Sequence, residues 1–196
     1  MKYYMSSFTG LFTLIWLIIL LSPPSAQTQD APLEVDMQGG DYLHLIYSSS
    51  STCPFSIDEE TIQMVQTIKE KLEAVAVEYN LDTWYTGIAG NDLDPVDGFE
   101  HLQKTGPYHE IIAGGRVFDL GNLEFIYGEL KGPGVTPQII FSRTTMTMEP
   151  NGMAIGEIRR NHRELSRFVA RDEIEELYKE VSERPAHEIG DVIGLR

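Results

Sequence analysis

Residues 42–56 are the stretch that most constrains the fold of this chain. Their sequence, YLHLIYSSSSTCPFS, leads from apolar and aromatic residues through a Ser/Thr run to Cys53, the only cysteine. A nearly continuous apolar run favours a strand covered on both faces, as in a parallel or mixed α/β sheet. Because apolar residues then recur at helical spacing over Ile57–Tyr79, the stretch predicts a strand, a cysteine-bearing loop and a helix in direct succession.

The start of this helix has two alternative interpretations. Pro54 suits the first helical position, which would make Cys53 the N-cap residue. Ser56 followed by Glu59 is instead a capping-box pattern, which would start the helix at Ile57. Under the first alternative the helix dipole acts directly on the thiolate. Under the second, the cysteine lies a few residues away in a loop.

Beyond this helix the pattern indicates a second buried strand, two short helices, a third strand, a hairpin and a final helix. The residue before the third strand is Pro137, which cannot donate to the sheet and is a candidate for a cis peptide bond. The predicted elements are strand Thr83–Ile88; a helix capped by Asp94 that runs from Pro95 to about Lys104; an irregular segment Thr105–Gly115; helix Gly121–Leu130; strand Gln138–Phe141; strands Thr144–Met148 and Met153–Ile158 around a turn at Glu149–Gly152; and a helix from about Asn161, recapped at Asp172 and Glu175, that ends at Pro185.

The beginning of the chain has the pattern of a secretory signal peptide. Lys2 precedes an apolar run over Leu11–Leu21 and a small-residue segment that ends at Ala26. Pro24 is awkward so close to a cleavage site, so an uncleaved N-terminal anchor is the alternative. We therefore expect an exported protein of the periplasm or cell envelope. The predicted organisation is 1–26 signal peptide, 27–40 polar tether, 41–182 folded domain and 183–196 loose C-terminal tail.

Charge and residue spacing exclude several classes of function. The formal net charge of −15 argues against nucleic acid and against an anionic membrane surface as partners, so membrane contact is expected only through an uncleaved signal segment. The histidines show no metal-ligand spacing. Asp92, Asp94 and Asp97 lack the later Glu and Gly of a calcium loop and are assigned to turns and helix caps. We predict neither a metal site nor a cofactor.

The order of elements, with TCPFS before the first helix and VTPQIIF at the third strand, resembles the thioredoxin fold. The resemblance covers roughly Asp41–Tyr178. It implies a central mixed sheet of four to five strands flanked by helices, with Pro137 cis, Thr136 before it, and both against the cysteine loop. The usual second cysteine is replaced by Ser56, so the CPFS motif resembles monothiol glutaredoxins, although a signal peptide is unlike their usual cytosolic setting with glutathione.

A narrower resemblance is to the thioredoxin-like pilin-assembly proteins of F-type conjugative transfer systems. It is carried by the signal peptide, the Ser-rich strand end, Gly90-Asn-Asp-Leu93 after the second strand, and Phe118-Asp119 ahead of a short helix and VTPQIIF. It implies an envelope protein in which the fold occurs without an obligatory redox pair.

Two hypotheses follow for the function. In the first, the chain is a monothiol exchange protein with Cys53 as the nucleophile and Ser56 as a hydroxyl donor to the thiolate. A lone cysteine can form a mixed disulfide with a partner but needs an outside thiol to resolve it. In the second, the chain is a non-catalytic binding or assembly module of a secretion or conjugative transfer apparatus, with the cysteine a structural thiol, Ser56 a helix cap and Pro137 a strand start. In either case a protein or peptide partner would lie along the substrate-binding residues Pro54, Phe55, Thr136 and Pro137.

Overall fold

The computed structural model describes residues 39–115, 119–148 and 158–196. The expected signal peptide, most of the expected tether and the expected turn at residues 149–152 lie outside the described residues. Residues Gln38–Arg196 form one compact unit. Its elements are β1 (Gly40–Ser48), α2 (Glu59–Glu78), β2 (Asp82–Ala89), α3 (Pro95–Gln103), β3 (Glu110–Ala113), the π-helix η2 (Asn122–Gly128), β4 (Gln138–Met148), β5 (Ile158–Val169), α4 (Ala170–Glu183) and α5 (Ala186–Val192).

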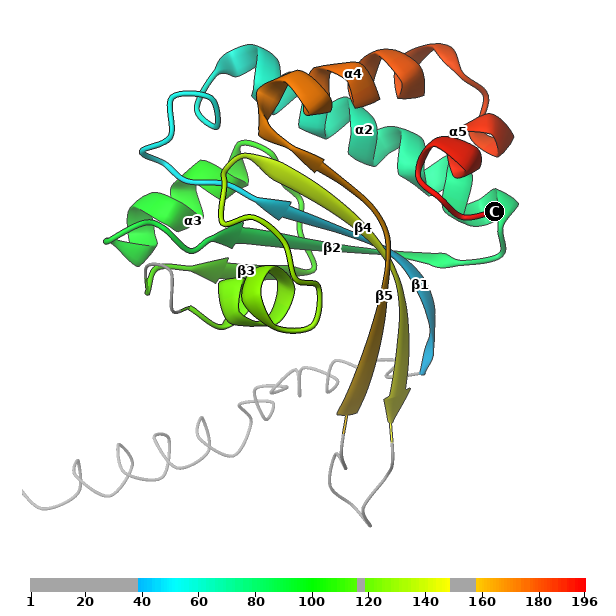
Figure 1. Cartoon of the computed structure of the whole chain (residues 1–196), viewed down its shortest axis with the longest axis horizontal. Coiled ribbons are helices and arrows are strands. Elements are labelled where there is room, and N and C mark those ends of the chain that lie inside the picture. Colours follow the sequence, from blue (N-terminus) through cyan, green and yellow to red (C-terminus); the bar gives the residue numbers. More distant parts are fainter. Residues whose placement is uncertain (1–38, 116–118, 149–157) are drawn as a thin grey trace, which may run out of the picture. The chain divides into compact units, whose positions relative to one another are not determined.

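The centre of the unit is a mixed five-stranded sheet in the order β3-β2-β1-β4-β5 (Figure 1). Strands β1, β2 and β3 are parallel, whereas β4 is antiparallel to β1 and β5 is antiparallel to β4. In the middle of the sheet Leu45 lies between Tyr85 and Phe141. The predicted class, an α/β fold with a mixed sheet flanked by helices, is confirmed, and the arrangement is compatible with a thioredoxin-like one.

Helices cover both faces of this sheet, which explains the continuous apolar run in β1. Leu43, Leu45 and Tyr47 point into the larger core, which they share with α2, α4 and α5. Ile46 points to the opposite face, where it packs with Phe125 of η2. Figure 1 shows α2, α4 and α5 together on one side of the sheet and the π-helix on the other.

Helix α2 starts later than either sequence interpretation predicted. Its N-cap is Asp58, whose carboxylate accepts a 3.1 Å hydrogen bond from the backbone N–H of Thr61. Cys53 therefore lies in the preceding loop and not at the helix terminus. The helix-cap role considered for Ser56 is wrong, because Asp58 is the N-cap and Ser56 lies two residues before it in the loop.

The final helix also starts later than predicted, because residues 158–169 form strand β5. Strand pairing overrides the helical spacing in this segment: β5 pairs with β4 along its length, and Phe168 packs edge-on against Phe141 with ring centroids 5.9 Å apart. Helix α4 begins at Ala170 and not at the proposed recapping site, and the N–H of Val169 donates to Glu173 at 2.6 Å.

The expected loose tail is also wrong. Pro185 ends α4 as predicted, but residues 186–192 form α5, and Ile189 and Ile193 join the larger core. The folded region therefore extends past the predicted boundary at residue 182. The segment predicted to be irregular over Thr105–Gly115 contains β3, which pairs with β2 over four residues.

Candidate functional site

Cys53 lies in a tight turn between β1 and α2 that hydrogen bonds hold in shape. Its backbone N–H donates to the carbonyl of Ser50 at 3.2 Å, and its own carbonyl accepts from Ser56 N–H at 3.0 Å. A buried carboxylate fixes the base of the loop: Asp92 accepts from the Ser50 hydroxyl at 2.7 Å and from the backbone N–H of Ser51 at 3.0 Å. Sequence reasoning assigned Asp92 only to a turn, and its hydrogen bonds to this loop were missed.

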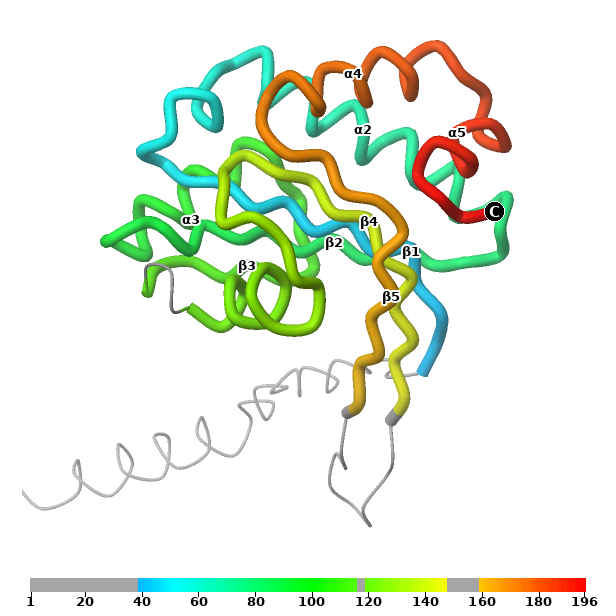
Figure 2. The backbone as a smooth tube through the Cα atoms, in the orientation of Figure 1, coloured from blue at the N-terminus to red at the C-terminus, as the bar shows by residue number. Residues whose placement is uncertain are grey.

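The structure brings the cysteine and the predicted cis-proline together. The Thr136–Pro137 peptide bond is cis, and the Cys53 thiol donates to the carbonyl oxygen of Thr136 at 3.3 Å, across 83 positions of sequence. Figure 2 traces how the chain returns from η2 through residues 129–137 into β4. The predicted proximity of the two motifs is confirmed, while the chemical roles proposed for their residues stay predictions.

The four residues of the CPFS motif differ in exposure. Cys53 is half-buried, Pro54 and Phe55 are exposed, and Ser56 is fully buried. The aromatic side chain of Phe55 is 56 % exposed. Cys53 is therefore partly accessible, next to the exposed side chain of Phe55.

Hydrogen bonding makes the thiol more acidic than usual. Burial raises the pKa of Cys53, but hydrogen bonds that favour the thiolate outweigh it and leave the pKa below its ordinary value. The groups responsible are the Ser56 hydroxyl and backbone, the Thr136 side chain and the Phe55 backbone. A lowered pKa increases the thiolate fraction near neutral pH, and the thiolate is the nucleophilic form.

Exposed apolar side chains flank the cysteine turn in the sequence: Phe55 and Ile57 follow Cys53, and Val135 precedes Thr136. Of the ten large hydrophobic residues exposed in the described part of the chain, Val77 lies on α2 away from the turn. Hydrogen bonds connect the cysteine loop to the loop before α3 through Asp92. The other nine are Phe55, Ile57, Leu93, Val96, Phe99, Leu120, Leu123, Tyr127 and Val135. Phe55 and Ile57 thus add exposed apolar area beside Cys53, and exposed apolar patches are typical of sites where another protein or peptide binds.

A second polar cluster lies on the η2 face of the sheet. His162 contacts Glu124 at 3.3 Å through one ring nitrogen and the hydroxyl of Thr144 at 2.8 Å through the other. The buried ring of His44 extends this series of hydrogen bonds. Its two ring nitrogens lie 3.0 Å from the Thr144 hydroxyl and 2.8 Å from the Thr86 hydroxyl. Burial, followed by the charge of His162, lowers the pKa of His44 well below its usual value. This cluster connects η2 to four strands and has the character of a structural network.

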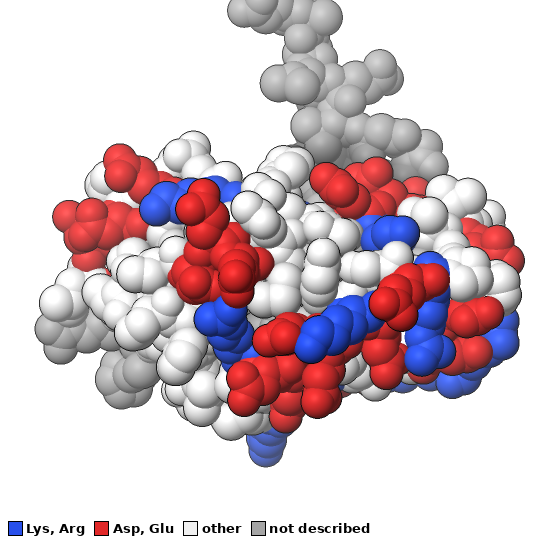
Figure 3. Space-filling view, turned by 90° about the horizontal axis from the view of Figure 1, so that it is seen from above, with Lys and Arg blue, Asp and Glu red and all other residues white. Residues whose placement is uncertain are grey.

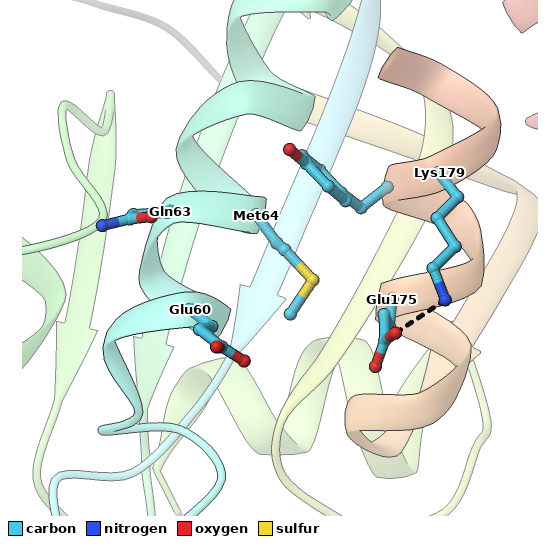
Figure 4. Close-up of a pocket in the computed structure, with 6 residues that line it drawn as sticks. Glu60, Gln63, Met64, Glu175 and Lys179 are labelled. Carbon is cyan, nitrogen blue, oxygen red and sulfur yellow. Dashed lines mark hydrogen bonds and ion pairs between the residues drawn. The ribbon is translucent and has the colours of Figure 1, made fainter. Parts of the chain in front are cut away.

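Two surface hollows flank the first turns of α2, and neither is lined by a predicted site residue. The one between α2 and α4, of about 260 Å³, contains Met64 at its base and the Glu175–Lys179 ion pair of 2.6 Å at its rim (Figure 4). The other, of about 470 Å³, runs from Ile57 to Lys104. On this helical side, acidic side chains outnumber the interspersed Lys and Arg (Figure 3), in keeping with the net charge of −15.

Within the described residues, no group of three or more His, Cys, Asp or Glu side chains is placed to hold a metal ion. No helix in residues 39–115, 119–148 and 158–196 is both long and apolar enough to cross a membrane. Comparisons with family models, with curated proteins and with solved structures find no match to this chain.

Proposed function

We propose that this chain is an exported, thioredoxin-like protein of the bacterial cell envelope that carries out monothiol thiol–disulfide exchange through Cys53. The observation that carries the proposal is the contact between the thiol and the Thr136–Pro137 peptide. It gives an accessible sulfur with a lowered pKa next to a backbone edge where an extended peptide can lie.

The exchange uses one thiolate and two outside reactants. The Cys53 thiolate attacks one sulfur of a partner disulfide, a new S–S bond forms, and the other partner sulfur leaves as a thiolate that takes up a proton. Because Cys53 is the only cysteine, a second, external thiol must then attack the mixed disulfide to release the protein. The mixed disulfide is therefore long-lived unless that thiol is supplied.

The experiment compares wild type with Cys53→Ala and Cys53→Ser in cells whose thiols are blocked by rapid alkylation. We expect wild type to carry partner proteins that reducing agent releases, and both variants to carry none. The thiol pKa of the purified protein should lie below the value of about 8.5 for free cysteine. An ordinary pKa, together with no trapped partner and full function of Cys53→Ala, would contradict thiol exchange.

The second candidate is a non-catalytic binding or assembly module of a secretion or conjugative transfer apparatus. The exposed apolar side chains of Phe55 and Ile57 beside Cys53, and of Val135 beside Thr136, favour it, since a binding surface needs no reactive thiol. It predicts that partners co-purify with Cys53→Ala as well as with wild type, and that Phe55→Ser removes them from both.

A further inference from the structure

The positive charges of this acidic chain are concentrated on two paired strands. Strands β4 and β5 together contain five of the 15 Lys and Arg residues of the chain, but only one of its 30 Asp and Glu residues, Glu164. The five are Arg143, Arg159, Arg160, Arg163 and Arg167. In a chain with a net charge of −15, these strands are the part that attracts an anionic partner.

Some of these arginines are neutralised within the fold. Arg160 lies 3.0 Å from the carboxylate of Glu110, which belongs to β3. Arg167 contacts Glu164 at 2.7 Å, and it also donates to the side-chain oxygen of Gln138 at 2.6 Å. These contacts join β5 to its surroundings, so both side chains have a structural role.

Arg163 is in a different position. It lies directly opposite Arg143 across the β4–β5 ladder, and Arg143 in turn lies opposite Leu43 of β1. Because directly opposite residues point to the same face of a sheet, these three side chains form one row. Leu43 is fully buried, whereas Arg143 and Arg163 are exposed.

The two arginines of this row share one carboxylate. Asp41 contacts Arg143 at 2.7 Å, but Arg163 forms no ion pair with any residue of 39–115, 119–148 and 158–196. Like charges directly opposite each other oppose strand pairing. A carboxylate supplied from outside the chain and placed beside Arg163 would remove this repulsion.

The backbone beside Arg163 is also available for binding. Strand β5 is the last of the sheet: it pairs with β4 on one side, and none of the described strands pairs with it on the other. An edge strand has a row of unpaired N–H and C=O groups. The alternate side chains Arg159, Asn161 and Arg163 are exposed, and neither Pro nor Gly interrupts the strand.

We propose that the free edge of β5 binds an extended, acidic segment of another protein. The segment pairs with β5 as a sixth strand, and one of its carboxylates lies opposite Arg163, where an arginine can bind it through two N–H groups. Since alternate residues of a strand share a face, the expected segment has Asp or Glu at every second position.

This surface is separate from the cysteine turn. The row of Arg163 crosses β1 at Leu43, whereas the cysteine loop follows the other end of β1, at Ser48. The proposal therefore adds a second binding surface and does not depend on the chemistry of Cys53.

The test is the binding of a fluorescein-labelled peptide with Glu at alternate positions between Val and Thr, followed by fluorescence anisotropy on the purified full-length protein. We expect saturable binding that weakens as salt is added. Arg163→Glu should weaken it about tenfold, because the reversal replaces an attraction by a repulsion of similar size. Since this variant places a carboxylate opposite Arg143, its urea midpoint should be unchanged or higher, which separates lost binding from lost folding.

Three controls accompany this measurement. Arg184→Glu makes the same change in net charge at an exposed residue at the end of α4, and it should bind the peptide like wild type. The same peptide with Lys in place of Glu should not bind. Cys53→Ala should bind like wild type, so this proposal and thiol exchange can fail independently.

The position of the bound peptide is measured by hydrogen exchange. We expect the peptide to slow amide exchange at residues 159–164. Protection at residues 54–56 and 135–137 instead would assign the peptide to the cysteine turn and overturn the proposal. Equally tight binding of heparin or of vesicles that contain phosphatidylserine would also overturn it, because it would indicate a surface for anions in general.

Absence of peptide binding would overturn the proposal as well. If Arg163→Glu then self-associates while wild type stays monomeric, the arginine serves to keep the edge of β5 from pairing with a second copy, a common use of charged side chains on edge strands. Analytical ultracentrifugation of both proteins without peptide provides this comparison.

Discussion

At the scale of single residues, the shape of the cysteine turn depends on small and polar side chains in neighbouring loops. Asp92 fixes the turn through Ser50 and Ser51. Two positions earlier, Gly90 lies directly against Asp119, whose carboxylate accepts from the Asn122 side chain at 2.6 Å. The loop after β2 therefore fits between the cysteine turn and the start of η2, and it leaves no room for a side chain at Gly90.

The prediction at this scale is that Gly90→Ala destabilises the fold. Its Cβ atom would overlap Oδ2 of Asp119 and the Asn122 amide nitrogen, so these hydrogen-bonded groups must move. We expect a loss of about 1–3 kcal/mol in the free energy of unfolding, measured by urea denaturation. Gly40→Ala is the control, because its Cβ would meet its nearest atom at an ordinary 3.5 Å. Equal stability of the two variants would contradict the close contact.

At the scale of elements, the histidine network holds η2 on the sheet. Glu124 comes from η2, His162 from β5, Thr144 from β4 and His44 from β1. The ring of His44 is fully buried, and burial disfavours its charged form, so that its pKa is lowered well below the usual value. Protonation of His44 therefore costs free energy in the folded state that it does not cost in the unfolded state.

This difference predicts acid sensitivity with a definite sign. The unfolded chain binds a proton at His44 below about pH 6.5, whereas the folded chain does not, so the free energy of unfolding falls as the pH falls below that value. The loss continues down to the folded-state pKa of His44, at up to about 1.4 kcal/mol per pH unit. His44→Gln, which cannot take up a proton, should show a smaller loss between about pH 7.5 and 5.5.

Denaturant midpoints of both proteins across this range provide the measurement. His101 and His109 also have pKa values lowered by burial, so His44→Gln should retain part of the acid loss. If the two proteins lose the same stability between the two pH values, the effect does not come from His44.

At the scale of the whole folded unit, the C-terminal helices complete the larger core. Helices α4 and α5 both pack on α2, and Ile174, Leu177, Val181, Ile189 and Ile193 share its core with the strands. The side of the unit that carries these helices is also strongly charged (Figure 3). The larger core therefore depends on residues at the far end of the described chain.

We expect Ile193→Ala to lower the free energy of unfolding by about 2–4 kcal/mol, since it removes a fully buried side chain from a close-packed core. Val77→Ala is the control, because Val77 is 80 % exposed and alanine is the better helix former. Thermal or urea unfolding of the two variants tests whether residues 186–196 belong to the cooperative unit. A neutral Ile193→Ala would show that they do not.

Sequence reasoning succeeded where a local pattern determines the structure. The apolar run of β1, the helix after the cysteine and the position of Pro137 at a strand start were all visible in short segments. The antiparallel pairing of β1 with β4 then brings the end of β1 next to the residue that follows Pro137. It failed for β5, because the spacing of Leu165, Phe168 and Val169 fits a helix as well as a strand and only pairing with β4 decides between them. The hydrogen bonds of Asp92 to the cysteine loop could not be predicted, because they join segments that are distant in the sequence.

The contact between Cys53 and Thr136 has a consequence for both charge states of the sulfur. A protonated sulfur donates to the carbonyl of Thr136, but an ionised one has no hydrogen to offer and is repelled by that oxygen. The hydroxyl on the same threonine favours the ionised form. Thr136 thus supplies an acceptor to the thiol and a donor to the thiolate. The cysteine turn therefore keeps a hydrogen bond to the segment before Pro137 when the sulfur loses its proton.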